Sequence, residues 1–213
     1  MDQMALFFFL LGTGLVAVLF VHELGHLLVA RHYGMKVLSL SVGFGPPLMN
    51  FTDRLGTSWK LRAFPLGGSC VIDENYDSKN NSVGKQADNK LLAQLLRQRA
   101  VIYAAGPIFN LIFAAASFGL VVSMLCTTCA LYGSEIGSPG VTGVRLIAEF
   151  SVATALFNLL PLVPLDGGRL CLTAIEAGLG RPMSPIGEKR FFMFSIVFIT
   201  GITLAYLMRM LSS

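Results

Sequence analysis

Residues 18–32 read VLFVHELGHLLVARH and place two histidines and a glutamate inside a run that is otherwise apolar. The run extends from Met4 to about Ala30, which exceeds the roughly 20 apolar residues that a membrane-spanning helix requires. It lacks a basic amino-terminal region and is longer than the apolar core of a signal peptide, so we expect an uncleaved membrane helix. Ionisable side chains are costly inside a span and usually mark a functional site.

The composition of the whole chain is that of a membrane protein. Its 213 residues are 54% hydrophobic and only 13% charged, against about 25% charged residues in soluble domains, and its mean hydropathy is +0.68. Three further apolar blocks follow at about 101–131, 141–165 and 191–210. We predict an α-helical integral membrane protein with about four spans, forming a single core over residues 1–213. The net charge of +4 does not indicate nucleic-acid binding, because the basic residues form no stripe interleaved with aromatic residues.

The basic residues predict the orientation in the membrane instead. Of the sixteen lysines and arginines, ten lie in residues 31–100 and four in residues 169–190, whereas the connection YGSEIGSPG has none. Cytoplasmic segments are enriched in lysine and arginine. We therefore expect both of these segments to be cytoplasmic and both termini to face outward.

The segment between the first and second spans shows a β-pattern. KVLSLSVGF (36–44) and SWKLRAFPL (58–66) alternate apolar and small or polar residues, and DRLG lies between them as a turn. We expect a β-hairpin or small sheet on the membrane surface. By composition, the segment divides into a membrane-associated β-region at 36–74, a flexible polar loop at 75–89 and an amphipathic lead-in helix at 90–99.

The spacing within HELGH indicates a metal site. His22 and His26 are four residues apart, so on a helix they differ by about 40° and lie on one face. Two imidazoles placed in this way can bind one Zn²⁺, and Glu23 can approach a metal-bound water without ligating the metal. The alternative is a buried polar network or a helix-end cap. His32, next to Arg31, is expected to be a surface residue.

A catalytic zinc site requires a third protein ligand. No histidine follows residue 32, so the third ligand should be a carboxylate inside or at the end of another span. Glu149 follows Arg145 by four residues, and an ion pair along the helix is a sufficient explanation for it. Asp166 lies at the cytoplasmic end of the third apolar block, at the depth of the histidines, and two glycines after it allow close backbone approach. We expect Asp166 to be the third ligand.

HELGH (22–26) together with NLLPLVPLDGG (158–168) resembles the paired signature of the site-2 proteases, which are intramembrane zinc metalloproteases. SVGFGPPL, DRLGTSWKLRAFPLGG and RAVIYAAGPIFNLIFA resemble the β-region and second span of the bacterial RseP-like branch. The resemblance implies zinc ligands His22, His26 and Asp166 with Glu23 as general base. It also implies that Asn158, and less directly Asn110, contact the unwound substrate. For Asn110, hydrogen bonding between helices is the alternative.

One feature departs from that branch, whose members carry PDZ domains between the second and third spans. Here that connection is LYGSEIGSPG (131–140), which is too short for a domain. The resemblance implies a multi-pass protease of the bacterial inner membrane that cleaves single-span proteins, either anti-sigma-factor-like substrates or remnant signal peptides. The alternatives are a catalytically silent chaperone or adaptor of the same fold and a metal transporter. The sequence does not predict an oligomeric state.

Overall fold

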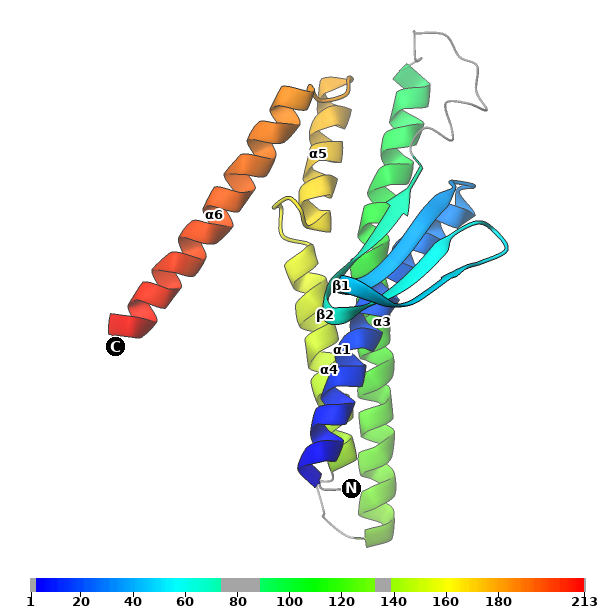
Figure 1. Cartoon of the computed structure of the whole chain (residues 1–213), viewed down its shortest axis with the longest axis vertical. Helices are drawn as coiled ribbons and strands as arrows, with labels where there is room; N and C mark the ends of the chain where they lie inside the picture. Colours follow the sequence, from blue (N-terminus) through cyan, green and yellow to red (C-terminus); the bar gives the residue numbers. More distant parts are fainter. Residues whose placement is uncertain (1–2, 74–88, 133–138, 213) are drawn as a thin grey trace. The chain divides into compact units, whose positions relative to one another are not determined.

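The computed structural model describes residues 3–73, 89–132 and 139–212 (Figure 1). Within these residues, four helices are long and apolar enough to cross a membrane: α1 (Gln3–His32), α3 (Asn89–Tyr132), α4 (Pro139–Asn158) and α6 (Pro185–Ser212). A shorter helix, α5 (Asp166–Leu179), precedes α6, and the strands β1 (Val37–Thr52) and β2 (Ser58–Ile72) lie between α1 and α3. The predicted fold class, a helical membrane protein with a small sheet between the first and second spans, is confirmed. The expected polar loop at 75–89 falls almost entirely outside the described residues.

The strands are longer than the sequence pattern predicted, because both bend instead of ending. β1 and β2 are antiparallel, and residues 39–42 of β1 have pairing partners in both 58–61 and 68–71 of β2. Gly43 and Gly45 of β1 have φ of 88°, and Gly67 of β2 has φ of 85°. These left-handed angles suit glycine, so the backbone turns sharply within a strand at these positions. The sheet exposes several large apolar side chains, namely Phe44, Leu48, Met49, Phe51, Leu55 and Phe64.

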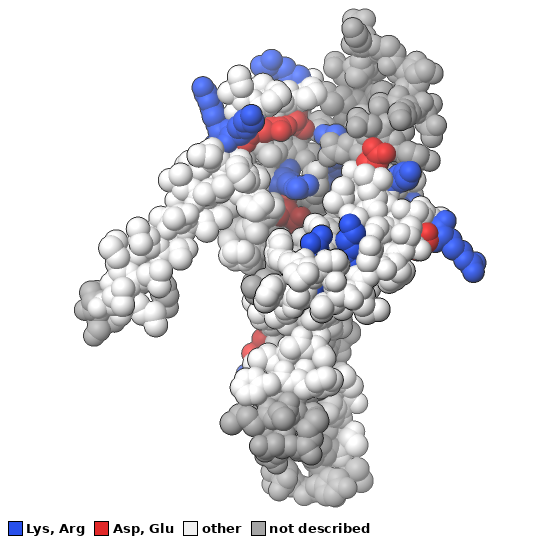
Figure 2. Space-filling view, viewed as in Figure 1, with Lys and Arg blue, Asp and Glu red and all other residues white. Residues whose placement is uncertain are grey.

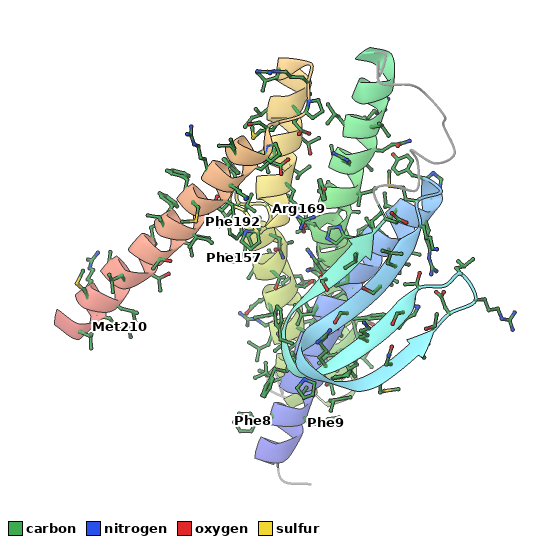
Figure 3. All side chains as sticks on the ribbon, turned by 45° about the horizontal axis from the view of Figure 1, so that its top comes forward. Phe8, Phe9, Phe157, Arg169, Phe192 and Met210 are labelled. Carbon is green, nitrogen blue, oxygen red and sulfur yellow. The ribbon has the colours of Figure 1, made fainter. Side chains whose placement is uncertain are left out.

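The chain forms two compact units. The first contains α1, the sheet, the part of α3 from Ala105 onward and α4 up to Leu156. Within it α1 and α3 approach very closely, since a Cβ added at Gly25 would stand 2.7 Å from the Ala105 carbonyl oxygen. Small residues at such a crossing allow two membrane helices to pack backbone to backbone. Phe8 and Phe9, at the amino-terminal end of α1, are largely exposed (Figure 3).

A polar network attaches the sheet to the end of α1. Arg31 forms an ion pair with Asp53 and donates a hydrogen bond to Thr57 Oγ1 at 2.8 Å. Thr57 is buried and donates in turn to the Val37 carbonyl oxygen at 2.7 Å. Trp59 Nε1 also donates to Asp53, and these bonds, chiefly that from Arg31, hold the pKa of the Asp53 carboxyl well below its usual range. The hairpin turn is therefore tied to the helix that carries HELGH.

The second unit contains the start of α3, the turn after α4, α5 and α6. α4 ends at Asn158, where the sequence predicted a span that continued to about residue 165, and Asp166 instead begins α5. The proline-rich stretch explains the difference, because a proline inside a helix removes a hydrogen bond and clashes with the preceding turn. The turn folds back tightly on α5, since a Cβ at Gly167 would stand 2.2 Å from the Leu159 carbonyl oxygen.

Among the described residues, two contacts link separate elements of this second unit. The backbone N–H of Val163 donates to Ser195 Oγ of α6 at 3.2 Å, and Ser195 donates to the Phe191 carbonyl oxygen. The guanidinium of Arg169 on α5 lies over the ring of Tyr103 on α3, 5.5 Å from its centroid (Figure 3). The expected separate lead-in helix at 90–99 is the first part of one continuous α3, which also runs through Pro107 without ending.

α6 is the most exposed of the four candidate spans. Its visible face carries no charged residue along its length, and basic residues gather at its start (Figure 2). Ser195 is fully buried, whereas most of the large side chains of α6 are exposed. An apolar helix that is exposed around most of its circumference suits a lipid environment.

Candidate metal centre

A pair of buried imidazoles lies on α1. His22 and His26 are only 6% and 7% exposed, and their Nε2 atoms are 3.3 Å apart. Two ligands at about 2.05 Å from a tetrahedral Zn²⁺ are separated by about 3.3 Å, since each ligand pair spans one edge of the tetrahedron. The Nε2 atoms therefore have the separation of two ligands on one zinc ion. Without a metal, the same distance allows a hydrogen bond between the rings.

α3 forms the wall behind these imidazoles at Gly106. A Cβ added there would stand 2.4 Å from His26 Nε2 and 2.8 Å from His22 Nε2. No side chain larger than glycine fits at this position without moving both rings. Gly106 could not be recognised from the sequence, because nothing in its local pattern distinguishes it from an ordinary helix breaker ahead of Pro107.

Asn110 lies one turn further along α3 and reaches the other side of His22. Its side chain is 0% exposed, and its Nδ2 is 3.4 Å from His22 Nδ1. Ser151 of α4 donates to the Asn110 carbonyl oxygen at 2.8 Å. The sequence left both a substrate contact and a hydrogen bond between helices open for Asn110, and the structure places its amide against His22 of α1.

Glu23, the predicted general base, is buried against the backbone of β2. A Cβ at Gly68 would stand 2.6 Å from Glu23 Oε1 and 2.8 Å from its Cγ. β2 therefore passes directly beside the carboxylate, and only glycine permits that approach. Cys70 lies two residues further along β2. Burial, and secondarily the negative charge of Glu23, raise the pKa of its thiol to about 12.

The remaining two predicted site residues belong to the second unit. Asn158 is the last residue of α4, and Asp166 is the first residue of α5. Gly167 and Gly168 after Asp166 are buried and have no room for a Cβ, because the chain of residues 159–163 folds over them. The tight turn therefore holds the carboxylate of Asp166 on a constrained backbone.

The fold and the HELGH helix define a multi-span membrane protein whose first span carries the metal-binding motif of metalloproteases. Two matches to the model of Peptidase family M50 cover residues 9–134 and 131–202. The chain belongs to peptidase family M50. The two matches meet at residues 131–134, next to the short connection between α3 and α4.

Curated relatives bear names that agree with this family. A putative zinc metalloprotease of Brucella suis is 41% identical over an alignment of 162 positions, which covers 68% of this chain and 41% of that protein. A putative zinc metalloprotease of Agrobacterium fabrum is 40% identical over 79% of this chain and 45% of its own. The regulator of sigma-E protease RseP of Salmonella typhimurium is 39% identical over 53% of this chain and 24% of its own. The chain thus spans less than half the length of these relatives. The resemblance to the RseP-like branch is confirmed.

Proposed function

We propose that this protein is an intramembrane zinc metalloprotease that hydrolyses a peptide bond within or near the transmembrane segment of single-span membrane proteins. The observation that carries the proposal is the 3.3 Å separation of His22 and His26 Nε2, buried inside a membrane helix with Glu23 between them in the chain. Buried imidazoles at ligand spacing in a span are costly without a metal to bind. Membership of peptidase family M50 supports the same conclusion.

His22, His26 and Asp166 would hold the zinc ion. A hard carboxylate oxygen and two imidazole nitrogens are a common set of ligands for catalytic zinc, with one position left open. The constrained turn at Gly167 and Gly168 supports Asp166 in this role, because a ligand on a rigid backbone loses little entropy on binding. Bound zinc lowers the pKa of water and polarises a carbonyl group.

Glu23 would act as the general base. Its carboxylate accepts a proton from the attacking water and returns that proton to the leaving amine. Contact with β2 at Gly68 restricts the carboxylate to a narrow range of positions, which a proton transfer over hydrogen-bonding distance requires. Asn158 would donate or accept hydrogen bonds with substrate backbone that has unwound from its helix, because such groups find no water in the bilayer.

The substrate would be a single-span protein in a bacterial inner membrane, either an anti-sigma-factor-like protein or a remnant signal peptide. With both termini outward, the HELGH end of α1 lies near the cytoplasmic side, where water has a short path. The edge of the sheet is suited to binding an extended substrate by strand addition. Proline at hydrogen-bonding positions of that edge should slow cleavage without reducing zinc content.

The test uses purified protein and a model single-span substrate in detergent or vesicles. The untreated protein should cleave, whereas addition of a chelator and the Glu23→Gln substitution should each abolish cleavage. The zinc content of Glu23→Gln should equal that of the wild type, since this residue is not a ligand. Uncut substrate in all three reactions would overturn the proposal in favour of a silent adaptor of the same fold.

A further inference from the structure

The amide of Asn110 has no role in the chemistry described so far, yet it is among the most buried polar groups of the chain. Its Nδ2 lies 3.4 Å from His22 Nδ1, and its Oδ1 has no hydrogen-bond partner in the described part of the structure. Ser151 holds the backbone beneath it through the Asn110 carbonyl oxygen. A buried polar oxygen without a partner costs about 1–3 kcal/mol, so its placement calls for a reason.

The tautomer of His22 supplies that reason. The 3.3 Å spacing places Nε2 of His22, and not Nδ1, toward His26. A lone pair on Nε2 is required for metal binding, so the proton of the neutral ring must lie on Nδ1. An Nδ1–H group needs an acceptor, and histidine ligands of metals usually find one in a carboxylate, a carbonyl or a water.

The Asn110 amide meets this need when its oxygen faces the ring. A half-turn about the last side-chain bond of asparagine exchanges the positions of the amide oxygen and nitrogen, and leaves the shape of the side chain almost unchanged. With Oδ1 toward His22, Nδ1–H donates to it. The oxygen then gains a donor, the amide nitrogen takes the former position of the oxygen, and the Nε2 lone pair is directed at the metal position.

We infer that Asn110 is a positioning residue that accepts a hydrogen bond from His22 Nδ1–H and thereby fixes His22 in the metal-binding tautomer. This inference deepens the proposed function and rests on it for its consequence, the affinity for metal. It agrees with the alternative that the sequence left open for Asn110, a hydrogen bond between helices, because the amide is fully buried against the His22 ring. The tautomer itself is a property of the metal-free protein.

Three variants test whether the Asn110 amide accepts a hydrogen bond from His22, donates one to it, or only packs against it. Asn110→Leu keeps the branched shape and the number of side-chain heavy atoms and removes the acceptor. Asn110→Asp keeps an acceptor and, when ionised, removes the donor, so it should rescue the effect if the amide accepts. Ser117→Ala is the matched control, since Ser117 is a buried polar residue of the same helix that donates to the Phe113 carbonyl oxygen.

The first measurement is the tautomer of His22 in metal-free protein labelled with ¹⁵N-histidine, with the signal assigned by its loss in His22→Gln. Wild type, Asn110→Asp and Ser117→Ala should show the Nδ1–H form, and Asn110→Leu should shift the proton toward Nε2. The second measurement is the dissociation constant for Co²⁺ from its visible absorption. Asn110→Leu should weaken Co²⁺ binding about 10- to 100-fold, in the range typical for residues that orient a ligand.

The outcomes distinguish the two proposals. A wild-type protein that binds no Co²⁺ would overturn the proposed function, while the tautomer would still test the role of Asn110. If Asn110→Leu keeps the wild-type tautomer of His22 and the wild-type affinity for Co²⁺, the inference is overturned and the proposed function is not. The same holds if Asn110→Asp is well folded but does not restore the tautomer and the affinity. If Asn110→Leu does not fold, the wild-type spectrum decides, because an Nε2–H form of His22 contradicts the inference.

Discussion

Replacing Gly106 with alanine should remove metal binding and leave the fold in place. The added Cβ would stand 2.4 Å from His26 Nε2 and 2.8 Å from His22 Nε2, where ordinary contact begins at 3.4 Å. The rings must therefore move by about 1 Å and about 0.6 Å, whereas metal–ligand distances tolerate only about 0.2 Å. Loss of a residue that merely orients a ligand typically weakens metal affinity about 10- to 100-fold. Because this substitution displaces two ligands, we expect the affinity for zinc to fall more than about 100-fold, which corresponds to about 2.7 kcal/mol.

The effect on the fold should be small because two contributions oppose each other. Alanine is about 1 kcal/mol better than glycine inside a helix, and overpacking costs about 1–3 kcal/mol. Gly119→Ala is the matched control, since it makes the same substitution in the same helix at a position with nothing within 4 Å of the added Cβ. Zinc stoichiometry after gel filtration, Co²⁺ titration and circular dichroism of the three proteins test this reasoning. Zinc binding by Gly106→Ala with wild-type affinity would refute it.

Three further predictions concern groups around the site. Gly68→Ala should displace the Glu23 carboxylate and lower kcat about 100-fold, the lower range for loss of a general base, with zinc content unchanged; an unaltered kcat would show that the contact is unimportant. The depressed pKa of Asp53, due mainly to Arg31, stabilises the sheet fully above the unfolded pKa of about 4, and this contribution is lost as pH falls through the folded value. The melting temperature of the wild type should therefore fall further on acidification below about pH 4 than that of Asp53→Asn. Equal falls in the melting temperatures of the two proteins would contradict the role of the ion pair. In a variant whose sole cysteine is Cys70, a pKa of about 12 predicts alkylation at pH 8 at least about 100-fold slower than in the denatured chain; equal rates in the two states would exclude a raised pKa.

Much of the membrane architecture could be read directly from the order of residues. The four spans, the sheet after the first span and the HELGH motif depend on composition and on spacing within one helix or strand, which are local properties. Membership of the family follows from the same motifs. The helix ends were predicted less accurately, since α4 ends at Asn158 and α5 was not expected. The reason is that prolines close together in the sequence leave open which turn ends the helix.

What required the tertiary structure was the set of residues that act on the motif from a distance. Gly106 and Asn110 come to His22 from α3, and Gly68 comes to Glu23 from β2. Their roles depend on how closely α1 approaches the backbone of its neighbours, and no pattern within a single element encodes that distance. The amino-acid sequence by itself determined where ionisable groups enter the membrane, because their cost there is a property of the residue. The tertiary structure alone decided which neighbours leave room for them and which atoms orient them.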